Sequence, residues 1–137
     1  MAVTLSTTPS SAATERPVNA WAADATALIC ATSAGVHAGL VMPHAEESVR
    51  MAVAFAIATV ALAATAVVMA VRPRPDVAAA TAVLLLGVAA AYVLSRTTGI
   101  PGLTTHPEPV DVLGVLVTSL EVSGAVLASW PLTRRSN

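Results

Sequence analysis

Charged side chains are scarce in this sequence. They make up 11% of its 137 residues, whereas a soluble domain carries about 25%. Hydrophobic residues make up 55% of the chain, and the mean hydropathy is +0.75. A soluble fold of this size cannot bury so much apolar surface. The composition therefore excludes a soluble globular domain and indicates a membrane protein.

Aromatic residues, lysine and cysteine are also rare or absent. Aromatic residues are 3% of the chain, too few for the aromatic girdles of an outer-membrane barrel. All 7 basic residues are arginines and the net charge is −1, so we expect no nucleic-acid partner. Cys30 is the single cysteine, which excludes an intramolecular disulfide and a thiolate metal cluster.

Long stretches without Asp, Glu, Lys or Arg predict the helices. Three such stretches cover residues 25–45, 51–71 and 77–95, and each is close to the ~20 residues that span a bilayer. A fourth stretch, 110–130, is interrupted by Asp111 near its start and by Glu121. Because helices satisfy their own backbone groups in lipid, we expect an all-α fold. The predicted transmembrane helices cover about 20–42, 50–71, 77–96 and 110–130.

Proline residues mark the ends of these segments. Pro43 is predicted to end or bend the first helix, and Pro131 to end the fourth. The connections are short, so successive helices should pack as an antiparallel up-down bundle. Residues 1–19 are predicted to be a disordered tail, 20–130 the transmembrane domain, and 131–137 a second tail.

The distribution of arginine predicts the orientation. Five arginines fall on the side of the two chain ends and two on the other side, which favours termini in the cytoplasm. The chain is therefore predicted to be a multi-pass protein of the plasma membrane with both tails cytoplasmic. The side of the chain ends carries Arg16, Arg72, Arg74, Arg134 and Arg135, and the outer side carries Arg50 and Arg96.

Small residues recur at every fourth position of the first segment. Such a stripe lets another helix approach closely, which favours association in lipid. It predicts a contact within the bundle, with another membrane subunit, or with a second copy of the chain. The stripe consists of Ala23, Ala27, Ala31, Gly35 and Gly39.

Glu121 lies near the centre of the fourth segment, ~15 Å along the helix from Asp111. A carboxylate at that depth is costly, so we expect it to face the other helices. Two interpretations stay open. In the first, Glu121 is a metal ligand, a proton carrier or the counter-ion of a buried cation. In the second, it is a protonated, hydrogen-bonded structural residue.

Histidines and carboxylates also gather at the outer end of the first segment. If Pro43 breaks the helix there, the turn after it could fold back over His37. Imidazole and carboxylate together bind zinc, copper or iron, which predicts a site for a divalent transition metal. Proton exchange by histidine and a purely structural role are the alternatives. The candidate metal ligands are His37, His44, Glu47 and Glu121.

Arg96 ends the third segment. Its side chain can extend to the lipid headgroups, or it can pair with a carboxylate of the outer half. Glu121 lies deeper in the membrane, so we expect Arg96 to form a structural ion pair with Asp111 or Glu47.

The polar residues around the two outer loops form a recognisable order over residues 20–130. In that order the chain resembles a family of small four-helix integral membrane proteins of actinobacteria, whose function is not established. The resemblance implies the four-helix fold and the membrane location, and no activity. The residues that carry it are His37, Pro43, His44, Glu47, Ser95, Arg96, Gly99, Ile100, Pro101, Glu108, Pro109, Asp111 and Glu121.

Together these features predict a small membrane protein with a polar, candidate metal-binding cluster at its outer face, acting as an accessory subunit of a larger membrane complex. A structural or assembly factor without a ligand is the alternative. An oligomeric transporter or channel is a weaker one, since a single central carboxylate would require self-association. The sequence has no phosphate-binding loop and no zinc-binding helix motif, so we do not expect an enzyme.

Overall fold

The computed structural model describes residues 19–104 and 106–133, and this part of the chain forms four helices. All four are long and apolar enough to cross a membrane. The predicted all-helical fold is therefore confirmed, while residues 1–18 and 134–137 of the predicted tails lie outside the described residues. The helices are α1 (Ala20–Glu47), α2 (Val49–Val71), α3 (Pro75–Thr97) and α4 (Val112–Thr133).

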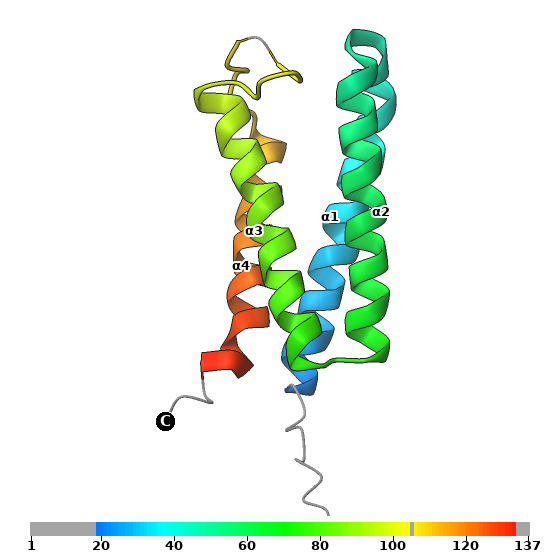
Figure 1. Ribbon diagram of the computed structural model, residues 1–137, viewed down its shortest axis with the longest axis vertical. Coiled ribbons are helices and arrows are strands. Elements are labelled where there is room, and N and C mark those ends of the chain that lie inside the picture. The colour runs from blue at the N-terminus through cyan, green and yellow to red at the C-terminus, as the bar shows by residue number, and fades with distance from the viewer. Residues whose placement is uncertain (1–18, 105, 134–137) are drawn as a thin grey trace, which may run out of the picture.

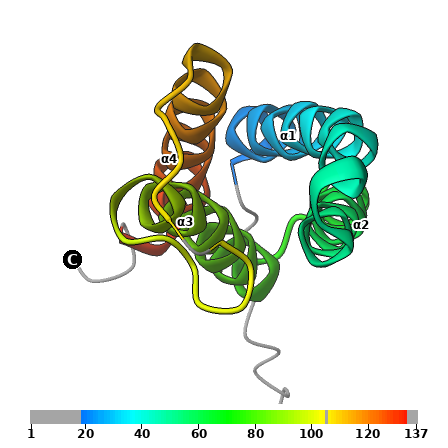
Figure 2. The same cartoon turned by 90° about the horizontal axis from the view of Figure 1, so that it is seen from above.

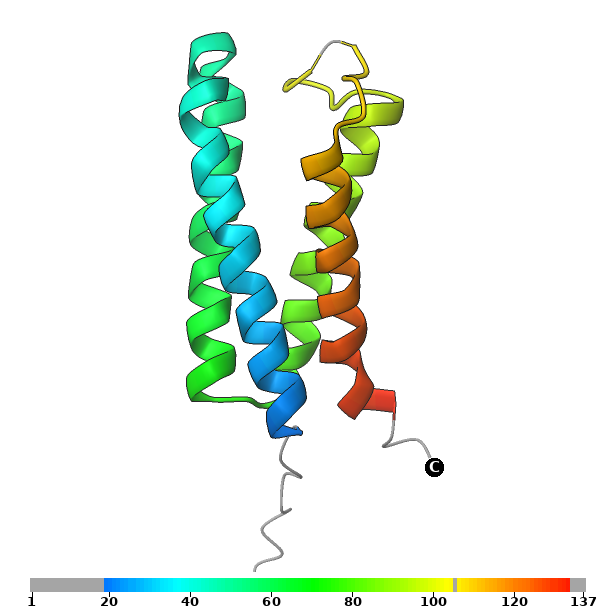
Figure 3. The same cartoon turned by 180° about the vertical axis from the view of Figure 1, so that it is seen from behind.

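The helices form two pairs, α1 with α2 and α3 with α4 (Figures 1 and 2). Both ends of the described chain and the α2–α3 connection lie at one end of the molecule, called here the terminal end. The α1–α2 turn and the loop of residues 98–111 lie at the other end, called the loop end (Figure 3). The two pairs lie closest near the terminal end and diverge toward the loop end.

Helix α1 continues through Pro43 to Glu47 instead of ending near residue 42. Proline has no N–H to donate to the carbonyl one turn earlier and disturbs the neighbouring bond. Here the carbonyl that loses its N–H donor is that of Gly39, and the His44 ring bonds through Nδ1 to the next carbonyl, that of Leu40, at 2.8 Å. The turn that was predicted to fold back over His37 is therefore helical.

The connections between helices follow from a few residues at their ends. Ser48 alone joins α1 to α2, in an extended conformation with φ −156°. Gly99 follows α3 with φ +74°, a conformation that favours glycine. The carboxylate of Asp111 accepts the amide of Gly114 at 2.6 Å, which caps the new helix. Helix α4 therefore starts at Val112.

The buried core lies mainly toward the terminal end. In α1 every buried residue falls between Ala22 and Ala34. Large apolar side chains such as Leu28 and Leu116 are exposed, as expected where lipid surrounds a bundle. The larger cluster contains Cys30, Ala34, Leu62, Ala66, Ala82, Leu85, Ala125 and Ala128, and a second cluster nearer the terminal end contains Ala23, Ala27 and Met69.

The small-residue stripe of α1 is divided between the core and the surface. Ala23 and Ala27 are buried in the second cluster. Ala31, Gly35 and Gly39 are exposed, and a Cβ added at either glycine would meet nothing within 4 Å. The first half of the stripe therefore packs inside the bundle, and the second half faces outward.

Candidate functional site

Glu121 is buried inside the bundle, with 1% of its surface exposed. Gly124 and Ala125, one turn further along α4, are buried as well, so this face of α4 is directed at the other helices. The Ser33 hydroxyl of α1 donates a hydrogen bond of 2.6 Å to Glu121 Oε1. This bond joins the two helix pairs near the middle of the molecule.

Close packing around Gly124 brings α4 near enough for this bond. A Cβ on Gly124 would lie 2.8 Å from Ile29 Cγ2 on α1 and 2.9 Å from Leu85 Cδ1 on α3. Real Cβ atoms do not come so close, so any side chain here would force Ile29 or Leu85 to shift. The missing side chain at this position allows α4 to approach both helices one turn below Glu121.

His37 lies one helical turn from Ser33 toward the loop end and adds a third polar group to the Ser33–Glu121 pair. Its Nδ1 atom lies 2.9 Å from the Ser33 carbonyl oxygen and 3.4 Å from Ser33 Oγ. The ring and the Glu121 carboxyl also interact electrostatically. Glu121, Ser33 and His37 are called here the polar relay. The first member is buried and the last is half-buried, so the relay leads outward from the core.

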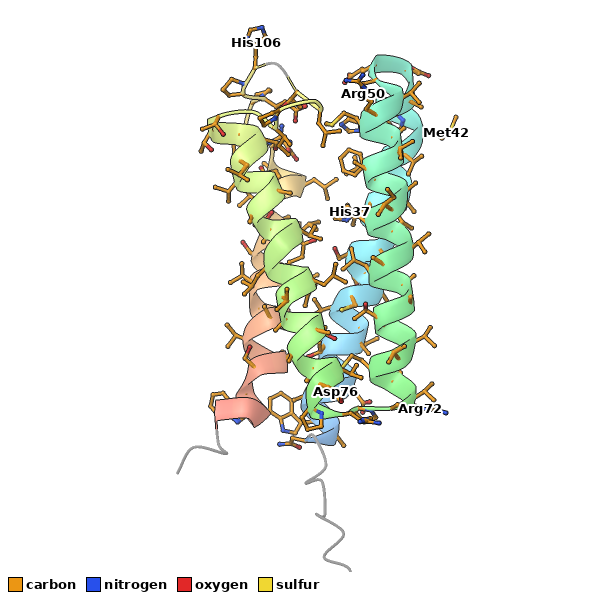
Figure 4. The ribbon with its side chains drawn as sticks, viewed as in Figure 1. His37, Met42, Arg50, Arg72, Asp76 and His106 are labelled. Carbon is orange, nitrogen blue, oxygen red and sulfur yellow. The ribbon has the colours of Figure 1, made fainter. Side chains whose placement is uncertain are left out.

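A second histidine, His44, lies between the relay and the loop end, next to the aromatic ring of Phe55 on α2. The Phe55 ring centroid is 5.7 Å from that of His37 and 4.5 Å from that of His44. Both histidines bond through Nδ1 to the carbonyl four residues earlier. With Nδ1 as the donor, Nε2 remains an acceptor. Figure 4 shows His37 between the two helix pairs, on the inner side of α2.

The structure does not bring the four predicted metal ligands together. His37 and Glu121 are linked through Ser33, His44 packs against Phe55, and Glu47 is exposed. Within residues 19–104 and 106–133, no group of three His, Cys, Asp or Glu side chains could hold a metal ion. Because α1 is continuous, Glu47 lies ten residues from His37, ~15 Å along the helix. A metal site at these residues is therefore not supported.

Arg96 forms the ion pair predicted at the outer end of α3. Its guanidinium binds Asp111 at 2.9 Å and also pairs with Glu108, which the sequence had not indicated as a partner. The guanidinium carbon lies 4.8 Å from the centroid of the Tyr92 ring. These contacts fasten the loop of residues 98–111 to α3, and they lie apart from the polar relay.

An open pocket of about 420 Å³ lies at the loop end, between the start of α2 and the loop that follows α3. Across it, the Arg50 side chain donates a hydrogen bond of 3.4 Å to the carbonyl of Gly102. Figure 4 places Arg50 at the same end of the molecule as His106. The residues around the pocket are Ser48, Val49, Arg50, Gly102, Leu103 and Thr104.

Sequence reasoning identified Glu121 and His37 but missed what connects them. Ser33 precedes His37 by one helical turn, and its small hydroxyl is typical of helix contacts in membranes. Nothing in the sequence indicated that Phe55 lies beside the two histidines, because a single phenylalanine in an apolar helix is ordinary. The chain matches no family model, and neither curated proteins nor solved structures match it.

Proposed function

We propose that this chain is an integral protein of the plasma membrane, and that its helices cross the bilayer as an antiparallel bundle with both termini in the cytoplasm. Length and apolar composition of all four helices support the membrane location. The arginines support the orientation, because five of them fall on the side of the chain ends and two on the other.

Within this protein the polar relay acts as a proton-binding site. The observation that carries the proposal is the 2.6 Å hydrogen bond from Ser33 to the buried Glu121, with His37 next to it. An ionisable residue inside a membrane protein marks a functional site by default. A hydroxyl can both donate and accept a hydrogen bond, and imidazole exchanges protons near neutral pH. The three groups therefore have the chemistry of proton transfer.

Proton binding at this position would alter the packing of the two helix pairs. Ser33 belongs to the first pair and Glu121 to the second, so their bond responds to the protonation of the carboxyl. A carboxylate only accepts hydrogen bonds, whereas a protonated carboxyl also donates one. This coupling suits an accessory subunit that reports pH to a larger membrane complex.

A structural role is the second candidate. The hydroxyl of Ser33 satisfies Glu121, and their bond links α1 to α4. A permanently protonated Glu121 would then act only as an interhelical lock. In that case the protein would serve as a structural or assembly factor without a ligand.

Infrared spectroscopy of the protein in lipid vesicles separates the two candidates. We expect the carboxyl band of protonated Glu121 to weaken as the pH is raised and to return as it is lowered. The band should be absent from Glu121→Gln and retained in Glu47→Gln, which changes an exposed carboxyl of α1. Ser33→Ala should shift its frequency, because the variant lacks the hydrogen-bond donor. A buried carboxyl band that never changes with pH would contradict proton binding and leave the structural role.

A further inference from the structure

We infer that protons reach Glu121 from the loop end alone, past His44, Phe55 and His37, and that the apolar core closes the way to the terminal end. The inference rests on the proposed function. It adds a direction to it: the protein binds protons from the outer side of the membrane and does not conduct them across.

The loop-end half of the molecule offers polar groups at successive depths. The pocket at the loop end is lined by Ser48, whose amide bonds to the carbonyl of His44 one turn below at 2.8 Å. His37 follows two turns further down α1, and both histidines are half-buried. A continuous α1 keeps both rings on one face because they are seven residues apart. That face runs along α1 from the turn at Ser48 to the polar relay.

The relay can transfer a proton from water to Glu121 through His37 and Ser33. A proton from water binds Nε2 of neutral His37, which carries its own proton on Nδ1. The Nδ1 proton moves to Ser33 Oγ, 3.4 Å away, while the hydroxyl proton of Ser33 moves to Glu121 Oε1. The products are a protonated Glu121, an intact hydroxyl and a neutral imidazole protonated on Nε2. Release of the proton is the reverse of this step.

Phe55 limits the passage of water, and with it of protons, from His44 to His37. Its ring contacts His44 on one side and His37 on the other, and it is the sole phenylalanine of the chain. An apolar ring cannot relay a proton, so water has to pass beside it. The ring therefore limits the rate without abolishing the path.

Toward the terminal end the path is closed by tightly packed apolar residues. Leu62 and Leu85 are both 0% exposed. On α4 the buried positions after Glu121 are Gly124, Ala125 and Ala128, and the two alanines are 2% and 1% exposed. The second apolar cluster, with Met69, lies still nearer the terminal end. The hydroxyls of Thr26 and Thr81 are also buried in this half, and Thr81 donates to the carbonyl of Val77 on its own helix. Between Cys30 and the terminal end, however, the described residues contain no buried ionisable side chain that could take up the proton from Glu121.

The charged and titratable groups around Glu121 are consistent with one-sided access. From α1, His37 and Cys30 interact electrostatically with it. Helix α2 has no titratable side chain between Arg50 and Arg72, and α3 has none between Asp76 and Tyr92. Of these neighbours, His37 is the one on the loop-end side of Glu121. It is thus the group placed to deliver the proton.

Vesicles that hold the protein in a single orientation test this inference. The interior is strongly buffered, the external pH is changed rapidly, and the infrared band of protonated Glu121 is followed in time. We expect the band to respond when the loop end faces outward and to stay constant on that time scale when the terminal end does. His37→Phe should slow the response by roughly tenfold or more, and Phe55→Ala should accelerate it.

Two further variants keep the result interpretable. His106→Phe removes an exposed histidine of the loop and should leave the response unchanged. His37→Gln replaces His37→Phe if that variant does not fold. A band that follows the pH of either side equally would overturn one-sided access and leave proton binding intact. A band that never titrates would overturn the proposed function as well.

Discussion

At the scale of single residues, the glycines of the helices differ in what surrounds them. Gly124 lies where α4 meets α1 and α3, and a Cβ there would overlap Ile29 and Leu85. Gly87, on α3, is exposed, and a Cβ there would meet nothing within 4 Å. The same substitution should therefore have opposite effects at the two positions.

We expect Gly124→Ala to lower the free energy of unfolding by about 1–3 kcal/mol, since extra volume in a packed interface forces the neighbours apart. Gly87→Ala is the matched control and should be neutral or slightly stabilising, because alanine favours helix more than glycine does. Thermal unfolding in detergent, followed by circular dichroism, measures both. Equal destabilisation by the two variants would contradict the close approach of α4.

At the scale of elements, Arg96 holds the loop of residues 98–111 against α3. Its side chain is 17% exposed, and its two partners differ in exposure: Glu108 is 28% exposed and Asp111 49%. Solvent weakens an ion pair, so Glu108 should be the stronger partner. Asp111 has a second role, since it also caps α4.

Double-mutant cycles measure these contributions. We expect Arg96→Gln and Asp111→Asn to couple by about 0.2–1 kcal/mol, the range of exposed pairs, and Arg96→Gln and Glu108→Gln to couple more strongly. Arg96→Gln and Glu121→Gln should be additive within about 0.5 kcal/mol, because Glu121 bonds Ser33 instead. Strong coupling between positions 96 and 121 would contradict the separation of the ion-pair cluster from the polar relay.

At the scale of the whole molecule, the two helix pairs are packed together near the terminal end and separate toward the loop end. The polar relay lies between the half in which the two pairs pack together and the half in which they diverge. If protons enter from the loop end as we propose, the orientation of the molecule in the membrane decides which compartment the relay senses.

Reporter fusions test that orientation. A reporter fused after Asn137 should report the cytoplasm, and one inserted between Thr104 and His106 should report the exterior, because arginine favours the cytoplasmic side. Activity of enzymatic reporters specific to each compartment gives the readout. If both reporters reported the same side, the assignment of four membrane crossings would be wrong.

The sequence by itself determined the helices and their apolar character. Residues 51–71 and 77–95 lack charged side chains, and a backbone in lipid has to satisfy its own hydrogen bonds, so the outcome depends on local composition alone. The ion pair of Arg96 was predictable as far as a choice between Asp111 and Glu47, because Arg96 ends the third segment and Asp111 begins the fourth at a similar depth; the structure selects Asp111.

Only the tertiary structure decided what the polar residues do. Pro43 does not end α1, which continues to Glu47 with the His44 ring bonded to the carbonyl of Leu40. That continuity separates Glu47 from His37 and removes the basis for the predicted metal site. The partner of Glu121 is Ser33, a contact set by how closely α4 approaches α1 at Gly124. Such distances between segments far apart in the chain depend on packing, which no local pattern encodes.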